Sequence, residues 1–230
     1  MAIKPILFNT EMVRAILDGR KRCTRRLVSS RQFLGMLQDK CKNAAPDEFL
    51  KGKRMMFKPY CDMTDAELIM TAYKAPYQPG DILYVRETWM DYAGLTMYKA
   101  DCDICRLDIL DLAGFGWHPS IHMPKEAARI WLKVTDVRVE RLQDITEAQT
   151  KEEGFLFTPP CLRITGENYC NIDGLCTSEI KYCDMREREL FGTVLWNSTI
   201  SESDLDRYGW DANPWVWVIE FERCEKPKGV

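Results

Sequence analysis

The segment NPWVWVIEFER, residues 213–223, constrains the fold more than any other part of the sequence. Its apolar side chains occupy both faces of an extended strand, with Trp215, Trp217, Ile219 and Phe221 on one face and Val216 and Val218 on the other. A strand that is apolar on both faces must be covered on both sides, so we expect it in the interior of a sheet. We interpret Trp215 and Trp217 as core residues.

A second strand is predicted for residues 129–141, RIWLKVTDVRVER. Its apolar residues alternate and then change phase, with Ile130, Leu132 and Val134 before the change and Val137 and Val139 after it. A shift of one residue turns every following side chain to the other face, so we expect a bulge or a sharp bend near Thr135 and Asp136.

The remaining elements are short. The turn signal Pro79-Gly80-Asp81 precedes a predicted strand with the sequence ILYVRETW, residues 82–89. Helices are predicted at 10–18, at 145–153 after a capping-box-like Asp144 and Glu147, at 185–197, and in part of 31–41. These patterns predict one α+β domain over residues 1–230, with a curved mixed sheet or small barrel, short flanking helices and inserted loops.

Composition limits the class of protein. With 46% hydrophobic and 29% charged residues, the chain has the composition of a globular domain, and no stretch reaches the roughly 18 apolar residues of a membrane span. We therefore expect a cytoplasmic protein that does not engage a membrane. The formal net charge of −3 argues against coating nucleic acid by bulk charge, but it leaves room for one basic pocket.

One basic run, LDGRKRCTRRLV at residues 17–28, follows the first predicted helix. Five basic residues surround a single threonine, Thr24: Arg20, Lys21, Arg22, Arg25 and Arg26. The run is either a solvated loop that complements the helix dipole or an anion site. In the second case Lys21 would activate the Thr24 hydroxyl while arginines hold phosphate, and Glu153 and Glu87 are the candidate carboxylate partners.

Aromatic and histidine residues give further candidates. Trp89 follows Arg86 and Glu87 at the end of a predicted strand, where a ring could stack on a nucleobase. His118 and His122 are four residues apart, but Pro119 between them argues against one helix that presents both to a metal. We interpret that segment as a turn.

Ten cysteines occur without a secretory signal, which favours reduced thiols or metal ligands over disulfides. Cys102 and Cys105 form a CxxC pair, and one structural zinc site would be completed by two of four later cysteines: Cys161, Cys170, Cys176 and Cys183. Isolated thiols are the alternative. No cofactor is required by the chemistry considered for Thr24.

The order of these motifs resembles the ASCH family of the PUA-like superfamily, in the form common in bacteriophage and prophage genomes. The resemblance is carried by KPILFNTEMVRAILDGRKRCTRR, PGDILYVRETW, WHPSIHMPKEAARIWLKVTDVRVERLQDITEAQTKEEGF, LFGTVLWNS and NPWVWVIEF. It covers residues 3–28, 76–100, 117–155 and 189–223, and it leaves insertions at about 29–75, 101–116 and 156–188.

The resemblance implies a PUA-like β-barrel with a cleft suited to RNA or to a modified nucleoside. The family includes bacterial acetylcytidine amidohydrolases with a similar GRKxxT loop, whose lysine and threonine fall on Lys21 and Thr24 and whose catalytic glutamate falls on Glu153. In that chemistry the threonine hydroxyl attacks the amide carbonyl of an acetylated cytosine. This chain has Arg22 and Cys23 where the smaller enzymes are less bulky and less charged.

We therefore expect a nucleic-acid-associated protein of the bacterial host cytoplasm that binds RNA or a modified nucleoside in a basic cleft. Hydrolysis of an acylated nucleoside amide is a further expectation. One alternative is a non-enzymatic reader, in which Arg20, Arg25 and Arg26 clamp phosphate and Trp89 stacks the base. Another is a phage accessory or morphogenesis protein that acts through protein contacts. The sequence identifies no protein partner.

Overall fold

The computed structural model describes residues 1–29, 64, 67, 69–70, 73–92, 94–102, 116–156 and 186–229. The helix predicted within 31–41 lies outside the described residues, as does most of each insertion expected from the resemblance. Cys105 and the four cysteines between 161 and 183 also lie outside them.

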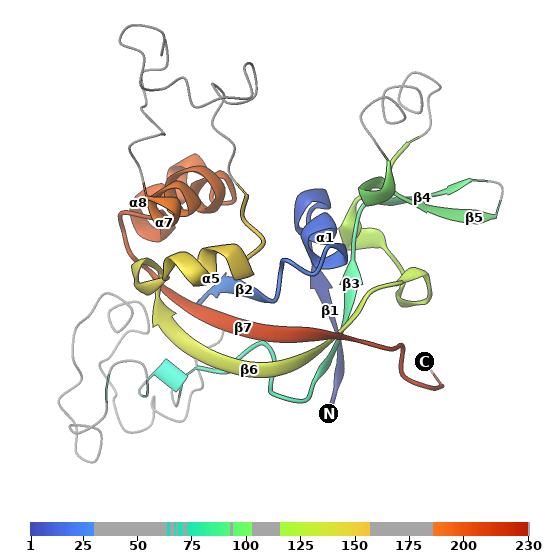
Figure 1. Ribbon diagram of the computed structural model, residues 1–230, viewed down its shortest axis with the longest axis horizontal. Coiled ribbons are helices and arrows are strands. Elements are labelled where there is room, and N and C mark those ends of the chain that lie inside the picture. The colour runs from blue at the N-terminus through green and yellow to red at the C-terminus, as the bar shows by residue number, and fades with distance from the viewer. Residues whose placement is uncertain are drawn as a thin grey trace, which may run out of the picture.

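A five-stranded mixed sheet forms the centre of the molecule (Figure 1). Its strands, in spatial order, are β1 (Ile3–Leu7), β3 (Ile82–Arg86), β6 (Trp131–Arg141), β7 (Trp215–Cys224) and β2 (Cys23–Leu27). Only β1 and β3 are parallel, and the other neighbours are antiparallel. The protein is thus mixed α+β, as the sequence predicts.

The last strand, β7, lies between β6 and β2, which confirms that it is internal. Its two apolar faces serve two cores. Trp217, Ile219 and Phe221 belong to the main core, whereas Val216 and Val218 pack in a second core under the C-terminal helices. Both faces of β7 are therefore covered.

The long strand β6 contains the predicted bulge. The register against β7 shifts between Val134 and Asp136, which pair with Phe221 and Glu220. The extra residue, Thr135, allows the apolar side chains before and after the phase change to enter the same main core. In Figure 1, β6 and β7 curve together beneath the helices.

The predicted strand 82–89 is two strands in the structure. β3 ends at Arg86, and β4 (Trp89–Tyr92) forms a separate hairpin with β5 (Leu95–Tyr98). The break falls at Glu87, whose carboxylate is buried and paired with Arg129. The pair lies where the chain leaves the main sheet, and no periodicity in ILYVRETW predicted this break.

The helices that border the site have clear caps. In α1 (Thr10–Leu17) the side chain of Asn9 accepts a hydrogen bond from the Met12 amide. In α5 (Glu147–Glu152) Thr146 and Gln149 form the capping box. The predicted cap at Asp144 was wrong, because residues Leu142–Asp144 form a 3-10 turn, η7, before the helix begins.

The third predicted helix is present but changes type along its length. It begins as α7 (Glu187–Leu190) and continues as a π-helix, η10 (Phe191–Trp196). A Cβ atom at Gly192 would overlap the indole of Trp210, so glycine is needed for this close packing. The other short helices are η4 (Lys99–Asp101), η5 (Ser120–His122), η6 (Lys125–Ala127), η11 (Glu202–Asp204) and α8 (Leu205–Tyr208).

The edges of the sheet, β1 and β2, are not paired with each other through their backbones in the described part of the chain. A side chain joins them instead, because the guanidinium of Arg26 on β2 donates to the Leu7 carbonyl on β1 at 2.8 Å. The described strands therefore form a curved, open sheet. No described helix is long and apolar enough to cross a membrane.

Candidate functional site

The basic run starts where α1 ends. Gly19 has a φ of +75°, which favours glycine, and the amides of Arg20 and Lys21 both donate to the Ala15 carbonyl. The chain then enters β2 at Cys23. The expectation of a loop through Thr24 was wrong, because Thr24 and the two arginines that follow it belong to a strand of the main sheet.

Lys21 and Glu153 form a buried ion pair between this turn and the end of α5. The Lys21 Nζ atom lies 2.7 Å from Glu153 Oε2 and 2.9 Å from the Glu153 carbonyl oxygen. The two side chains are 0% and 4% exposed. A backbone hydrogen bond of 2.7 Å from the Arg22 amide to the Glu152 carbonyl fixes the same junction. The structure thus brings together two residues 132 positions apart.

Arg25 extends this pair into a network on one face of the sheet. Its Nη1 atom donates to Glu153 Oε1 at 3.2 Å, and its Nη2 atom donates to Glu140 Oε2 at 3.3 Å. Glu140 in turn accepts from Arg138 at 2.6 Å. The Arg25 side chain is 1% exposed, so the structure directs it toward carboxylates and not toward solvent. Its buried Nε atom has no hydrogen-bond partner among the described residues.

Thr24 lies on the opposite face of β2 from Arg25, because side chains alternate along a strand. It pairs with Ile219 of the main core and is 1% exposed. Its hydroxyl donates no hydrogen bond to the described residues. On the same face, Arg26 covers the Phe8 ring with its guanidinium 5.4 Å from the ring centroid. Burial lowers the pKa of Arg26, and the charge of Glu153 opposes that shift.

Gly154 controls how closely the end of α5 approaches this turn. Its φ is +78°, and a Cβ atom there would lie 2.6 Å from the Ala15 Cβ and 2.9 Å from the Lys21 Cβ. The Gly154 carbonyl accepts a hydrogen bond of 2.9 Å from Arg20, which also pairs with Asp18 at 2.8 Å. Arg20 therefore holds the chain after α5 in place.

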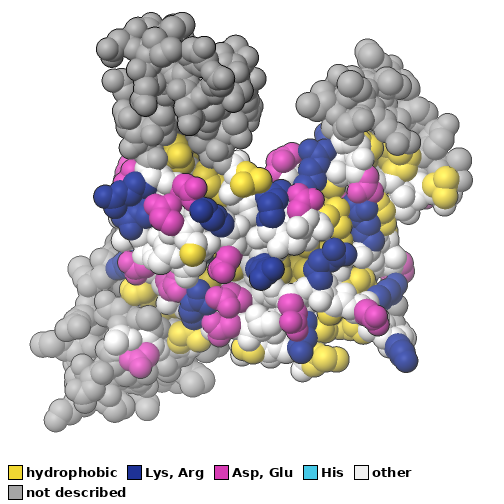
Figure 2. Space-filling model, in the orientation of Figure 1, with side chains coloured by type: hydrophobic (Ala, Val, Ile, Leu, Met, Phe, Trp, Pro, Cys, Tyr) yellow, Lys and Arg dark blue, Asp and Glu magenta, His cyan; other side chains and the backbone are white. Residues whose placement is uncertain are grey.

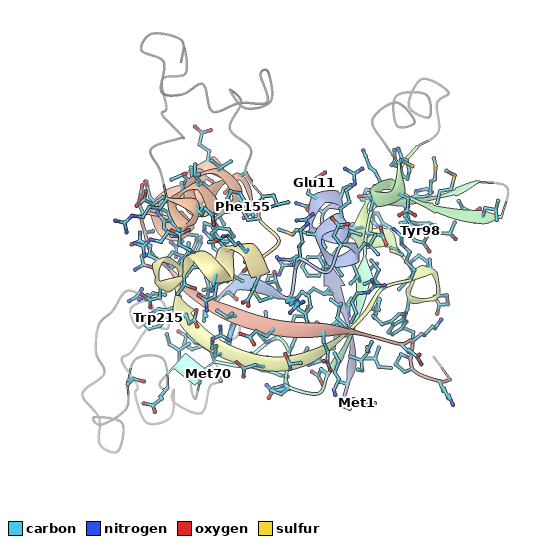
Figure 3. All side chains as sticks on the ribbon, in the orientation of Figure 1. Met1, Glu11, Met70, Tyr98, Phe155 and Trp215 are labelled. Atoms are coloured by element: carbon cyan, nitrogen blue, oxygen red, sulfur yellow. The ribbon has the colours of Figure 1, made fainter. Side chains whose placement is uncertain are left out.

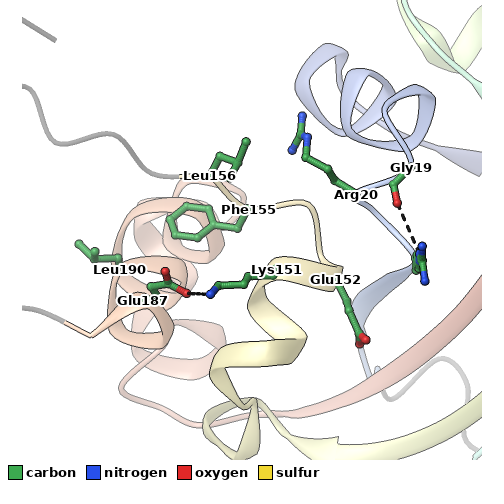
Figure 4. Close-up of a pocket in the computed structure, with 9 residues that line it drawn as sticks. Gly19, Arg20, Lys151, Glu152, Phe155, Leu156, Glu187 and Leu190 are labelled. Carbon is green, nitrogen blue, oxygen red and sulfur yellow. Dashed lines mark hydrogen bonds and ion pairs between the residues drawn. The ribbon is translucent and has the colours of Figure 1, made fainter. Parts of the chain in front are cut away.

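A pocket of about 410 Å³ lies between the basic turn and the two helices α5 and α7 (Figure 4). It is lined by Gly19, Arg20, Arg22, Lys151, Glu152, Phe155, Leu156, Glu187 and Leu190. Lys21, Thr24 and Glu153 do not line it, although residues next to Lys21 and Glu153 do. The candidate catalytic residues thus lie behind the pocket wall.

Of the nine lining residues, only Arg20 was singled out as a site residue from the sequence, and Arg22, Phe155, Leu156 and Leu190 are among those that were missed. Arg22 belonged to the basic run, but the run gave no reason to prefer it. One signal in the sequence could have indicated the apolar wall. Phe155 and Leu156 follow directly after Gly154, which ends the helix, and a solvent-exposed loop at that point would have polar residues instead. Leu156 is in fact 71% exposed.

No family model, curated protein or solved structure gives a significant match to this chain. The likeness to the ASCH family therefore depends on the motifs in the sequence, and the functions that it implies are proposals.

The other predicted ligand residues lie on the far side of α1. Figure 3 shows Tyr98 and Phe155 on opposite sides of that helix. Arg86 donates to the carbonyls of Ile121 and Met123, the latter at 2.8 Å. Trp89 packs against the ring of His118, with the ring centroids 5.0 Å apart. The structure does not bring these residues into the pocket beside the basic turn.

Glu87 forms a second buried cluster. Arg129 donates to both of its oxygens, at 2.9 and 3.0 Å, and also reaches Asp101 at 2.6 Å. The Arg129 guanidinium lies 3.9 Å from the Tyr98 ring centroid. Burial raises the pKa of Glu87, although the hydrogen bonds from Arg129 oppose that shift.

The described cysteines, Cys23, Cys102 and Cys224, are free thiols. Burial, together with the charge of Glu153, raises the pKa of Cys23 to about 12, so its thiol is a poor nucleophile. Cys102 is buried, and its Sγ atom lies 3.7 Å from the Tyr98 carbonyl. The described ranges contain no group of three or more His, Cys, Asp or Glu residues suited to a metal. The zinc hypothesis needs Cys105 and later cysteines, which lie outside those ranges.

Proposed function

We propose that this protein binds RNA or a modified nucleoside in the pocket between the Gly19–Arg22 turn and α5. The observation that carries the proposal is the position of that pocket, because the resemblance implies a ligand cleft between the basic turn and the Glu153 helix. The resemblance also implies a PUA-like barrel. The curved sheet, with Arg26 joining its two edge strands, supports that fold.

The size and lining of the pocket suit one nucleoside. Ligand sites commonly have volumes of about 300 to 1,000 Å³, with apolar walls and a few polar groups, and a pocket of about 410 Å³ falls in that range. Phe155 meets Phe191 edge to face, with centroids 5.9 Å apart, while it also lines the pocket. A fixed aromatic ring of this kind offers a surface on which a base can stack.

The charge distribution supports local recognition and not binding along an extended track. Figure 2 shows basic and acidic side chains interspersed over the visible face. The pocket itself is lined by three cations, Arg20, Arg22 and Lys151, and by two carboxylates, Glu152 and Glu187. A small excess of positive charge at one concave site is suited to a single nucleotide or a short strand.

The test is a binding measurement with the intact chain, using the four ribonucleosides, acetylcytidine and short single-stranded RNA. Phe155→Ala should weaken binding about tenfold, since a stacked base contributes roughly 1–3 kcal/mol. Leu95→Ala removes an exposed apolar side chain from the distant hairpin and is the matched control. Binding that is unchanged in Phe155→Ala, with its fold checked by thermal melting, would exclude this pocket.

A second candidate function is hydrolysis of an acylated nucleoside amide. It is favoured by one observation: Lys21 and Glu153, two of the three residues that the resemblance assigns to catalysis, form a buried ion pair. In this reaction the Thr24 oxygen bonds to the amide carbonyl carbon, its proton passes by way of Glu153 to the departing amine, and water then releases the acyl group. All three residues are buried, so the reaction requires the pocket wall to open.

The test of hydrolysis is incubation with acetylcytidine and other acylated nucleosides, followed by mass detection of the products. Thr24→Val keeps the shape of the side chain and removes the hydroxyl, so turnover should be lost while affinity stays within a few-fold. Lys21→Ala should also abolish turnover. Turnover that persists in Thr24→Val would overturn the assignment of the nucleophile.

A further inference from the structure

The cations that line the pocket differ in how their charges are neutralised. Arg20 pairs with Asp18 at 2.8 Å and donates to the Gly154 carbonyl at 2.9 Å. Lys151 lies 3.5 Å from a Glu187 carboxylate oxygen. Both charges therefore have a partner within the protein, and Figure 4 shows the pair of Lys151 with Glu187.

Arg22 has no such partner in the described chain. Its side chain is exposed, and the only described group that it reaches is the Gly19 carbonyl, 3.4 Å from Nε. Glu152 lines the same pocket but forms no ion pair with Arg22, and Figure 4 shows Glu152 directed toward the sheet. Arg22 is thus the unneutralised guanidinium of the pocket.

The backbone of Arg22 is held from both sides. Its amide donates to the Glu152 carbonyl at 2.7 Å, and its carbonyl accepts from the Phe221 amide at 2.9 Å. These bonds tie it to α5 and to β7. A guanidinium on a fixed backbone at the rim of a pocket loses less conformational entropy when it binds an anion than a guanidinium on a free loop does.

We propose that Arg22 binds a phosphate group of the ligand, so that the pocket takes a nucleotide in preference to a neutral nucleoside. Phe155, Leu156 and Leu190 form the apolar wall for the base, and Arg22 supplies the fork of donors that matches phosphate oxygens. This inference rests on the proposed function and deepens it by naming the charged part of the ligand.

The experiment is calorimetric titration of the intact chain with the four ribonucleosides and acetylcytidine, each beside its own 5′-monophosphate. The monophosphate should bind about tenfold more tightly than the nucleoside, as one charge-assisted hydrogen-bond pair implies. In Arg22→Ala that preference should disappear while nucleoside affinity changes less than about twofold. Arg22→Lys should retain part of it. Arg223→Ala, an exposed arginine at the end of β7, is the matched control and should behave as wild type.

Two further arms identify the source of the phosphate. A 3′-monophosphate and a trinucleotide are titrated alongside. If the trinucleotide binds more tightly than both monophosphates, the phosphate recognised by Arg22 is one within a strand. Equal binding of nucleoside and monophosphate to wild type would overturn the role of Arg22 and leave nucleoside binding intact. If the Arg22→Ala variant still prefers the monophosphate over the nucleoside, another residue binds the phosphate. If nothing in the panel binds, the proposed function and this inference both fail.

Discussion

Glu153 and Glu87 are both buried carboxylates that pair with cations, but their surroundings differ. Glu153 is shared by Lys21 and Arg25, which are themselves buried, and the described part of the chain gives the Arg25 Nε atom no partner. Glu87 accepts two hydrogen bonds from the guanidinium of Arg129, whose Nη1 atom also donates to Asp101. Arg129 thus binds both oxygens of Glu87, whereas the Glu153 cluster keeps one buried donor, the Arg25 Nε–H, without a partner among the described residues.

This difference separates a structural cluster from a candidate functional one. The Glu87 cluster lies at the turn where β3 gives way to β4, and Arg129 donates there to both oxygens of Glu87 and to Asp101. The Glu153 cluster lies behind the lining of the pocket, because Arg22 and Glu152, the chain neighbours of Lys21 and Glu153, line it. A buried polar network that is fully satisfied rigidifies a fold, whereas a buried donor without a partner calls for an explanation of its own.

The largest effect is expected for Glu153→Ala. Removing this carboxylate leaves Lys21 and Arg25 buried with too few partners, and such a change costs about 3–5 kcal/mol of unfolding free energy. Urea unfolding measures it. Glu222→Ala breaks an exposed pair with Lys133 and should cost no more than about 0.5 kcal/mol. A loss below about 1 kcal/mol in Glu153→Ala would show that the cluster is hydrated in solution.

A smaller loss is expected for Glu87→Ala, about 2 kcal/mol, in the range of hydrogen bonds to charged groups. The Arg129 side chain is 26% exposed and keeps Asp101 and the Tyr98 ring as partners, so it is not stranded. The same unfolding assay applies, with Asp101→Ala as the milder variant. If Glu87→Ala costs as much as Glu153→Ala, the contrast between the clusters fails.

Glu87 and a third carboxylate, Asp81, are expected to change the stability of the protein with pH in opposite directions. Hydrogen bonds from Lys4 and from the amides of Ala2 and Gln78 overcome the effect of burial and hold the pKa of Asp81 below its ordinary 3.8. Its contribution to stability is therefore present above pH 3.8 and is lost as the pH falls through the lower folded value. The raised pKa of Glu87 has the opposite sign, since its ionisation weakens the folded state as the pH rises above 4.5.

Unfolding profiles between pH 2 and 6 test these signs. Asp81→Asn should flatten the decline of stability below about pH 4, whereas Glu87→Gln should leave that decline in place. A decline that disappears in Glu87→Gln would mean that the Glu87 cluster, and not the Lys4–Asp81 pair, carries the acid sensitivity.

The smallest effect concerns Cys23, beside Lys21 in the first cluster. A buried thiol with a pKa of about 12 should react with iodoacetamide at pH 8 only when the protein opens. Mass spectrometry of the alkylated peptides measures the rate, with Cys224, which is less buried, as the internal reference. Labelling of Cys23 as fast as that of Cys224 would show that the wall in front of Lys21 and Thr24 opens readily.

Local patterns in the sequence determined several features of this protein. The two apolar faces of residues 215–221 predicted an internal strand, and the phase change in 129–141 predicted the bulge found at Thr135. The ends of α1 and α5 at Gly19 and Gly154 were also evident. Each of these depends on residues close together in the chain, so alternation, capping and backbone freedom suffice to predict it.

Tertiary structure alone decided how the charges are used. The basic run offered five similar cations, but the fold pairs Lys21 and Arg25 with Glu153, 132 and 128 positions away, and leaves Arg22 at the pocket. Likewise, the predicted strand ILYVRETW breaks at Glu87, whose carboxylate binds Arg129, 42 positions away. Whether a charged side chain is solvated, paired or poised for a ligand depends on partners that the fold supplies, and no local pattern in the sequence encodes them.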